Sequence, residues 1–418
     1  MTATPLPDAA PLHDVLIIGG GLVGASLAIA LHQAGLDVGL VEASAPDALP
    51  AVFDERNLSF SEATVHGLTA LGVLDRLRSP AGAIERIHVS RQGDFGRTLL
   101  EAARHGRSEF GRVVVARDFG LALEARLSEM AALRRYRPAR FVGLDPLEGA
   151  GPRGVRIVDG GGERRLRAQV LVAADGTGSG VRQALGIGCD HHDYGQTLFV
   201  TRLRTQRPPD GTAYERLGPD GPTALLPRGD GHYGLVHGVE RACADEVAAL
   251  DDAGFLARVQ AHFGWRAGRF LACGARSAYP VARSLAQSLI APRAVLVGNA
   301  AQTVHPIGAQ GFNLGLRDAL TLAELLARAR AADALADCGD AALLEEYARR
   351  RHDDRARTVA FSDGLARISA NPAEGLRPLR SLGFWAADRV PSLQAWLVGA
   401  AMGYRGDVPA LCRAQDAS

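Results

Sequence analysis

Three glycines near the start of the chain have the spacing of a phosphate-binding turn. Gly19, Gly21 and Gly24 follow directly after the apolar run 15–18, and a helical pattern begins at Ala25. In a strand–turn–helix unit the first glycine permits the tight turn, the second admits a pyrophosphate to the backbone, and the third lets the helix approach the strand. The free N–H groups and partial positive charge of the helix start attract phosphate. This segment therefore predicts a dinucleotide site.

A carboxylate completes the unit. The run 38–41 predicts a second buried strand, and Glu42 follows it directly. A carboxylate at this point can accept hydrogen bonds from both hydroxyls of a ribose, and it would repel a 2′-phosphate. NADP is therefore disfavoured here, whereas NAD and FAD both remain open. A glycine turn without a ligand is the alternative, and the complete order of strand, turn, helix, strand and acid argues against it.

Two later apolar strands also end at polar residues. The first is followed by a glycine-rich turn and a helix that opens at Val181, and the second by a loop with Pro306 and a helix that begins near Gly311. The residues directly after these strands are Asp175 and Gly176 in the first segment, and Gly298 and Asn299 in the second. The glycine turn alone does not choose between NAD and FAD, but an NAD-dependent dehydrogenase would leave both later segments unexplained.

Together the three segments resemble the three fingerprints of the single-component FAD-dependent aromatic hydroxylases, in the same order and spacing over most of the chain. The segments 298–303 and 310–315 resemble the ubiquinone-biosynthesis branch most closely, in particular the 2-polyprenyl-6-methoxyphenol hydroxylases. Asn299 and Gln302 stand where most relatives carry Asp and His, and that branch is similar in the replacement. The pair Gly308-Ala309 reverses the usual order, and alanine and glycine differ in the φ values that they permit.

The resemblance implies an α/β protein with an α+β substrate lobe. A Rossmann-like βαβ domain with a parallel sheet would bind FAD, an antiparallel-sheet substrate domain would be interleaved with it, and C-terminal helices would follow. The expected boundaries are 1–75, 100–185 and 280–355 for the FAD-binding domain, 76–99 and 186–279 for the substrate domain, and 356–418 for the C-terminal helical region.

The resemblance also implies roles for residues at the flavin. Asp175 and Gly176 would lie near the ribityl chain and the pyrophosphate, and Asn299 beside Gly298 would hydrogen-bond a ribityl hydroxyl, since an amide can serve a neutral partner as a carboxylate does. The helix that opens at Gly311, Phe312 and Asn313 would direct its N–H groups at the flavin N1–C2=O edge and stabilise negative charge there.

Four other positions are assigned by resemblance alone. Pro306 resembles the proline whose carbonyl lies close to the reactive carbon of the flavin, and Pro306 and Gln310 are the candidate catalytic residues. Arg56 resembles an arginine near the pyrophosphate or the moving flavin ring, and Arg117 resembles another arginine on the FAD side. For each arginine a surface ion pair is the alternative.

The chemistry implied by the resemblance comes from the cofactor. NAD(P)H would reduce the flavin, dioxygen would add to form a C4a-hydroperoxide, and its distal oxygen would attack an electron-rich ring. The substrate would be a polyprenylated phenol, converted from 2-polyprenyl-6-methoxyphenol to the 1,4-benzoquinol in ubiquinone biosynthesis. The alternatives are another ring position or aromatic substrate, a different flavoenzyme such as a prenyl reductase or halogenase, and a non-catalytic flavin-binding scaffold subunit.

Composition excludes several other classes. The 47 basic and 46 acidic residues nearly balance, which gives no reason to expect nucleic acid as a partner. All the basic residues are arginines, so Schiff-base chemistry on a lysine is impossible. The five scattered cysteines fit a reduced cytoplasmic protein, and no metal site is expected. His191 and His192 are expected in a solvated loop, because adjacent strand residues make a poor chelate.

Alternation of polar and apolar residues predicts strands at 197–205, 223–227 and 232–239, consistent with an antiparallel sheet whose inner face covers the flavin ring. Aromatic side chains in this region either line a substrate pocket or pack in the core, and packing is favoured for each one taken alone. These side chains are Phe199, Tyr214, Tyr233 and His237.

Apolar spacing predicts helices at 341–361 and 378–402. The favoured interpretation is a pair of helices packed on the core. The functional alternative is an apolar doorway for an isoprenoid tail, or a docking face for other ubiquinone-biosynthesis proteins or for lipid. A ligand that partitions into lipid makes peripheral contact with the inner membrane compatible with this sequence.

Overall fold

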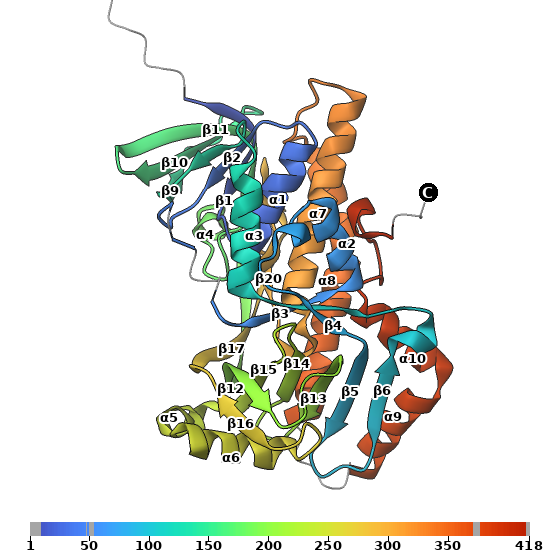
Figure 1. Cartoon of the computed structure of the whole chain (residues 1–418). Coiled ribbons are helices and arrows are strands. Elements are labelled where there is room, and N and C mark those ends of the chain that lie inside the picture. Colours follow the sequence, from blue (N-terminus) through green and yellow to red (C-terminus); the bar gives the residue numbers. More distant parts are fainter. Residues whose placement is uncertain (1–9, 47, 50–53, 371–376, 415–418) are drawn as a thin grey trace, which may run out of the picture.

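A parallel sheet forms the centre of the upper lobe of the molecule (Figure 1). The computed structural model describes residues 10–46, 48–49, 54–370 and 377–414. Five parallel strands lie in the order β19-β11-β1-β2-β8, and three antiparallel strands extend the sheet. The parallel strands are β1 (Leu12–Ile18), β2 (Val38–Val41), β8 (Arg134–Tyr136), β11 (Gly162–Ala173) and β19 (Ala294–Leu296), and the others are β9 (Ala139–Leu144), β10 (Arg153–Asp159) and β18 (Ile290–Ala291).

Helices cover this sheet because its strands are apolar on both faces. Val15, Leu16 and Ile17 of β1 are completely buried. The helices of this lobe are α1 (Leu22–Gln33), α2 (Glu62–Ala70), α3 (Ala116–Ser128), α4 (Gly180–Ala184) and α7 (Gln310–Ala332). A small sheet of β3 (Asn57–Ser61), β7 (Gly111–Val115) and β4 (Gly82–Ile84) lies between the lobes.

The lower lobe is built on a nine-stranded sheet, antiparallel except for the pair β13 and β5. Its strands are β5 (Arg86–Arg91), β6 (Arg97–Glu101), β12 (Cys189–Thr205), β13 (Thr212–Leu217), β14 (Thr223–Pro227), β15 (Tyr233–Glu240), β16 (Phe270–Cys273), β17 (Ser277–Ala286) and β20 (Gln302–Thr303). Helices α5 (Ala244–Ala249) and α6 (Asp252–Phe263) lie on its outer side (Figure 1). The α/β class with an antiparallel lobe, predicted from the sequence, is confirmed.

Two local expectations were wrong. His191 and His192 lie in β12, opposite Ser284 and Arg283 of β17, and not in a loop. The helix expected at 378–402 is divided into α9 (Arg377–Arg389) and α10 (Pro391–Ala401). Val390 is extended at φ −89° and ψ 112°, as expected for a residue that precedes a proline, because the proline ring disfavours helical backbone there.

The long helix α8 (Ala341–Ala370) connects the lobes. It runs without a break across residue 356, where the C-terminal helical region was expected to begin. No helix among the described residues combines the length and the hydropathy needed to cross a bilayer. Short 3-10 turns complete the fold at Leu74–Arg76, Ala102–His105, Arg241–Cys243, Gly298–Ala300, Ile307–Ala309 and Ala410–Cys412.

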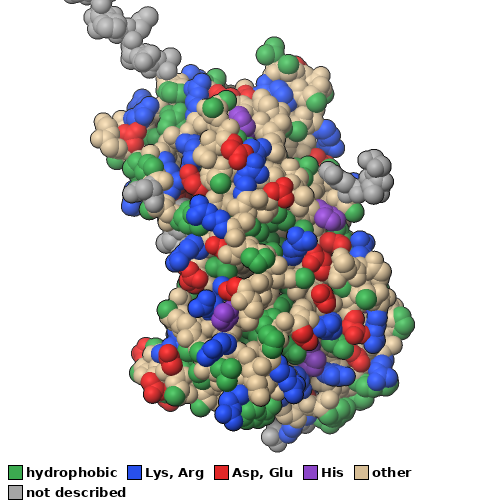
Figure 2. Space-filling view, viewed as in Figure 1, with side chains coloured by type: hydrophobic (Ala, Val, Ile, Leu, Met, Phe, Trp, Pro, Cys, Tyr) green, Lys and Arg blue, Asp and Glu red, His purple; other side chains and the backbone are tan. Residues whose placement is uncertain are grey.

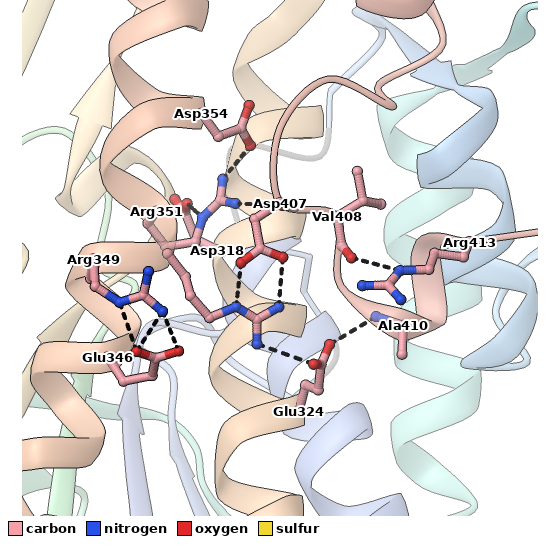
Figure 3. Close-up of polar contacts among 11 residues, drawn as sticks. Asp318, Glu324, Glu346, Arg349, Arg351, Asp354, Asp407, Val408, Ala410 and Arg413 are labelled. Carbon is pink, nitrogen blue, oxygen red and sulfur yellow. Dashed lines mark hydrogen bonds and ion pairs between the residues drawn. The ribbon is translucent and has the colours of Figure 1, made fainter.

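A buried ion network joins α7 to α8 (Figure 3). Arg351 donates to Asp318 at 2.8 Å and to Asp354 at 2.6 Å. Arg317 also donates to Asp354, at 2.7 Å. Burial alone would raise the pKa of Asp354, but the guanidinium groups of Arg317 and Arg351 outweigh it and hold that pKa below its usual value. The second oxygen of Asp318 accepts from Gln302 at 2.6 Å and from the backbone of Gly298 at 3.3 Å. The network therefore holds the segment after β19 in place.

We expect Arg351→Met to lower the free energy of unfolding by about 3 kcal/mol, because it leaves the carboxylate of Asp318 buried without its cation. Thermal unfolding of the FAD-saturated protein measures the loss. Arg349→Met is the matched control on the same helix, since the Arg349 side chain is 72% exposed and pairs with Glu346 on the surface (Figure 3). It should change the stability by less than ~0.5 kcal/mol, and equal losses in the two variants would contradict the structural role of the network.

Candidate active site

The ends of three adjacent strands meet at one edge of the parallel sheet. Because β1, β11 and β19 run in the same direction, the turns after their carboxyl ends lie side by side. A Cβ atom at Gly19 would lie 2.4 Å from the carbonyl oxygen of Ala174, and at Gly24 it would lie 1.9 Å from the carbonyl oxygen of Gly19. Only glycine therefore allows this turn and the helix after it to approach so closely.

A cavity of about 1370 Å³ begins at these strand ends and extends between the two lobes. Drug-sized ligands occupy sites of roughly 300–1,000 Å³, so this cavity has room for a dinucleotide and a second ligand. The predicted residues that line it are Gly19, Gly21, Glu42, Arg56, Asp175, Gly176, Asn299, Pro306, Gln310, Gly311, Phe312 and Asn313. Gly24, Gly298 and Arg117 lie outside the lining.

The acidic residues at the strand ends fit a ligand that carries hydroxyl groups. Oδ2 of Asp175 accepts from the backbone of Val181 at 3.1 Å, but Oδ1 is buried without a partner among the described residues. Glu42 accepts from the backbone of Gly20 at 2.8 Å and of Ser44 at 2.7 Å. Each carboxylate oxygen has more than one acceptor position, so both residues can still receive ribose or ribityl hydroxyls.

Helix α7 begins at the cavity wall, with Gln310 as its first residue. The side chain of Asn313 is occupied within the protein, since it accepts from Ser61 at 3.0 Å and donates to Ser59 and Ala309. The ring of Phe312 packs against Phe60. These contacts fix the helix start, so its free backbone N–H groups are what it can offer to an anionic ligand.

The loop before α7 has an unusual backbone. Gly308 has φ +72° and Ala309 has φ +52°, so both residues have a left-handed backbone conformation. This conformation is unfavourable for alanine, because its Cβ atom comes too close to the following carbonyl oxygen. His305 anchors this loop, because its Nδ1 accepts from the backbone of Ile307 at 3.1 Å and its Nε2 lies 3.2 Å from Oε1 of Gln196. Burial lowers the pKa of His305 to about 4, so the ring is neutral at physiological pH.

The two predicted arginines differ in position. Arg56 lines the cavity, donates to Asp54 at 2.8 Å and lies 4.5 Å from the ring centre of Tyr279. Arg117 pairs with Glu55 at 2.7 Å, and both side chains are more than half exposed. The assignment of each arginine to FAD stays a prediction. Sequence reasoning had missed Tyr279, which no local motif distinguishes from an ordinary strand residue.

Three of the four aromatic residues predicted in the antiparallel sheet turn away from the cavity, whereas the fourth, Tyr214, lines it. Phe199, Tyr233 and His237 are buried on the outer face, where Phe199 and Tyr233 pack against α6. The alternate residues of the same strands face the cavity instead, among them Leu198, Val200 and Val236. On β13 the same alternation directs Glu215 to the cavity. Sequence reasoning had missed this carboxylate, and the alternation in 212–217 was the available signal.

Comparisons with known proteins agree with this arrangement. The model of the family described as FAD binding domain matches residues 13–362. The chain is 33% identical to ubiquinone hydroxylase UbiL of Rhodospirillum rubrum, over 95% of this chain and 91% of that protein. The chain belongs to the FAD binding domain family. It is an FAD-dependent monooxygenase, and the resemblance inferred from its three fingerprints is confirmed.

One further relative and one solved structure extend this result. The 3-demethoxyubiquinol 3-hydroxylase of Escherichia coli is 29% identical over 93% of this chain and 98% of that protein. The p-nitrophenol 4-monooxygenase PnpA of Pseudomonas putida DLL-E4 shares the fold, with a TM-score of 0.77 at 18% identity, over 95% of this chain and 99% of that one. The FAD-dependent monooxygenase fold thus accounts for almost the whole chain.

We expect Asn299→Leu to weaken FAD binding about tenfold, because it removes one hydrogen-bonding group from the cavity of this monooxygenase. Titration of FAD into the FAD-depleted protein measures the dissociation constant. Gln33→Leu makes a comparable exchange at the far end of α1, outside the cavity lining, and should leave the constant unchanged. Equal constants for the wild type and Asn299→Leu would contradict the placement of Asn299 at the cofactor.

Proposed function

We propose that this monooxygenase hydroxylates the ring of a polyprenylated phenol on the route to ubiquinone, with 2-polyprenyl-6-methoxyphenol converted to the 1,4-benzoquinol. NAD(P)H and dioxygen are its proposed cosubstrates, and bound FAD would supply the electron transfer and the activation of oxygen. The protein's own task is to orient the ring, exclude water and handle the phenolic proton. The activities for which the related ubiquinone hydroxylases are named support this class of substrate.

The observation that carries the proposal is the apolar continuation of the cavity. The cavity extends from the loop 306–309, along the antiparallel sheet, to the C-terminal helices. The lining at this end belongs to α8, α9 and α10 and consists of Phe361, Leu365, Ile368, Leu379, Arg380, Gly383, Phe384, Ala387, Leu397 and Ala401. A small polar phenol needs no such extension, whereas an isoprenoid tail gains free energy from every apolar contact along it.

The outer faces of α9 and α10 support peripheral contact with a membrane. Leu379, Leu382, Trp385 and Trp396 are each at least half exposed on these helices. Figure 2 shows hydrophobic side chains interspersed with basic and acidic ones over this part of the lower lobe. Because the same two helices also line the cavity, we propose that a lipid-dissolved substrate enters between them.

A second candidate is hydroxylation of another ring position, on another prenylated precursor of the same route. The name of the E. coli relative, 3-demethoxyubiquinol 3-hydroxylase, favours it. Both candidates require the same cofactor and an isoprenoid tail, and they differ in the substituents of the ring and in how the ring lies against the flavin.

We expect the purified holoenzyme to insert one oxygen atom from isotopically heavy dioxygen into 2-prenyl-6-methoxyphenol carrying a short isoprenoid tail, with NAD(P)H consumed in proportion. Mass spectrometry of the product identifies the position. Oxygen insertion only into a demethoxylated quinol would support the second candidate. Absence of insertion into every prenylated phenol, with FAD fully bound, would contradict the enzymatic proposal and favour a scaffold.

We expect Ala387→Trp to raise the KM for a long-tailed phenol about tenfold or more, since it obstructs the apolar end of the cavity, and to leave the KM for a short-tailed phenol unchanged. Ala386→Trp places the same side chain one residue along α9, outside the lining, and serves as the matched control. An equal effect of Ala387→Trp on both tail lengths would contradict the proposed route of the tail.

A further inference from the structure

The cavity face of the antiparallel sheet carries a single charged side chain. The lining residues of β5, β6 and β12 to β15 are otherwise uncharged, and most are aliphatic. Glu215 stands among them on β13, paired in the sheet with Val89 of β5 and Ala224 of β14. A carboxylate on an apolar face is costly to keep ionised, so its presence requires an explanation other than packing.

The side chain of Glu215 lies against the loop 306–309, which precedes α7. Glu215 lines the cavity, and its Oε1 is buried without a hydrogen-bond partner among the described residues. Desolvation raises the pKa of Glu215 to about 7, and the backbone amide of Gly308 opposes the rise. Gly308 lies two residues after Pro306. The carboxylate thus lies between the loop 306–309, which we assign to the cofactor side, and the part of the cavity that we assign to the substrate ring.

No other charged group accounts for the state of Glu215. Its strand neighbours Val89 and Ala224 do not titrate, nor does the loop 306–309 that it faces. Charged and titratable groups elsewhere in the lining are Glu42, Arg56, Arg140, Asp175, Tyr214, Tyr279 and Arg380, and none of them is among the causes of its shifted pKa. The described residues therefore leave the carboxylate available to a ligand.

We propose that Glu215 is the base that accepts the proton of the substrate's phenolic hydroxyl. This proposal deepens the proposed function and rests on it. The O–H bond of the phenol breaks, its proton forms a bond to Oε1 of Glu215, and the electron pair stays on the phenolate oxygen, where it raises the electron density of the ring. After oxygen insertion the hydroxylated ring carbon releases its hydrogen as a proton to water. Glu215 then returns its proton to the oxygen of the original phenolic group.

The geometry suits this task. General bases work best when their pKa is close to the working pH, and such groups contribute roughly 10²- to 10⁴-fold to a rate. An ordinary exposed glutamate would be too weak a base, whereas a desolvated one is stronger and still ionises near neutrality. A carboxylate that lacks a protein partner can also select for a phenol, because a methyl ether would leave it unpaired.

The test compares Glu215→Gln with the wild-type holoenzyme on the short-tailed 2-prenyl-6-methoxyphenol. We expect kcat at pH 7 to fall about 100-fold with little change in KM. The remaining rate should rise with pH as the phenol itself ionises, near ~10 for a simple phenol, whereas the wild-type rate should rise through pH of about 7. Glu240→Gln, at the exposed end of β15, is the matched control and should keep the wild-type profile.

Two measurements do not depend on turnover. Equilibrium binding should favour the phenol over its methyl ether in the wild type, and Glu215→Gln should lose about tenfold of that preference. Because folding raises the pKa of Glu215 from 4.5 to about 7, the wild type loses stability as pH rises between these two values, and the loss is complete above 7. The thermal midpoint of Glu215→Gln should therefore exceed the wild-type midpoint at pH 8 and match it at pH 4.

An unchanged kcat and pH profile in Glu215→Gln would overturn the proposal. Loss of FAD or a lower thermal midpoint at pH 8 would also overturn it, since either result assigns the carboxylate a structural role. If the wild type hydroxylates no phenol, the proposed function fails by itself. The binding preference and the pH-dependent midpoint would then still decide whether Glu215 is a free buried carboxylate that recognises a hydroxyl.

Discussion

A side chain at Gly19 would stand 2.4 Å from the carbonyl oxygen of Ala174, so the first turn of the dinucleotide unit and the segment after β11 can meet only with glycine there. This close approach sets the distance between two of the three strand ends that line the cofactor side of the cavity. Asp175 follows directly after that contact. The position of its buried carboxylate relative to the turn is thus a consequence of the backbone contact at Gly19.

The third strand end is held differently, by charge. Asp318 of α7 accepts from the backbone of Gly298 and from Gln302, and Arg351 of α8 neutralises it. Asn299 follows Gly298 in this tethered segment. Buried ion pairs gain little net stability over apolar packing, but they fix geometry, because a carboxylate in a dry interior tolerates few arrangements of its donors. Cofactor-side residues are therefore positioned by backbone contact at one strand end and by a buried ion network at another.

The substrate side of the cavity follows a different principle. Here the sheet presents mostly aliphatic side chains to the cavity, while Phe199 and Tyr233 pack against α6 on its other face. This apolar wall can accept a hydrophobic ring and tail but does not fix the position of the ring. Glu215 supplies one polar contact that can fix it. The loop with left-handed Gly308 and Ala309 brings the cofactor segment up to this wall. Chemistry at the ring would thus be governed by the meeting of one loop and one strand.

The local sequence was sufficient to determine the parallel dinucleotide unit and the polar residues at its strand ends, because glycine spacing and strand-terminal polar residues act over a few positions. The assignment to FAD came from the resemblance of all three segments to a known family. It did not determine the burial of Phe199 and His237 or the exposure of Glu215 to the cavity. Each of those depends on which face of a sheet or helix a residue occupies. Side chains alternate along a strand, so a shift of one residue exchanges wall and core. That register was decided by pairing with strands far away in the chain, and only the tertiary structure contains it.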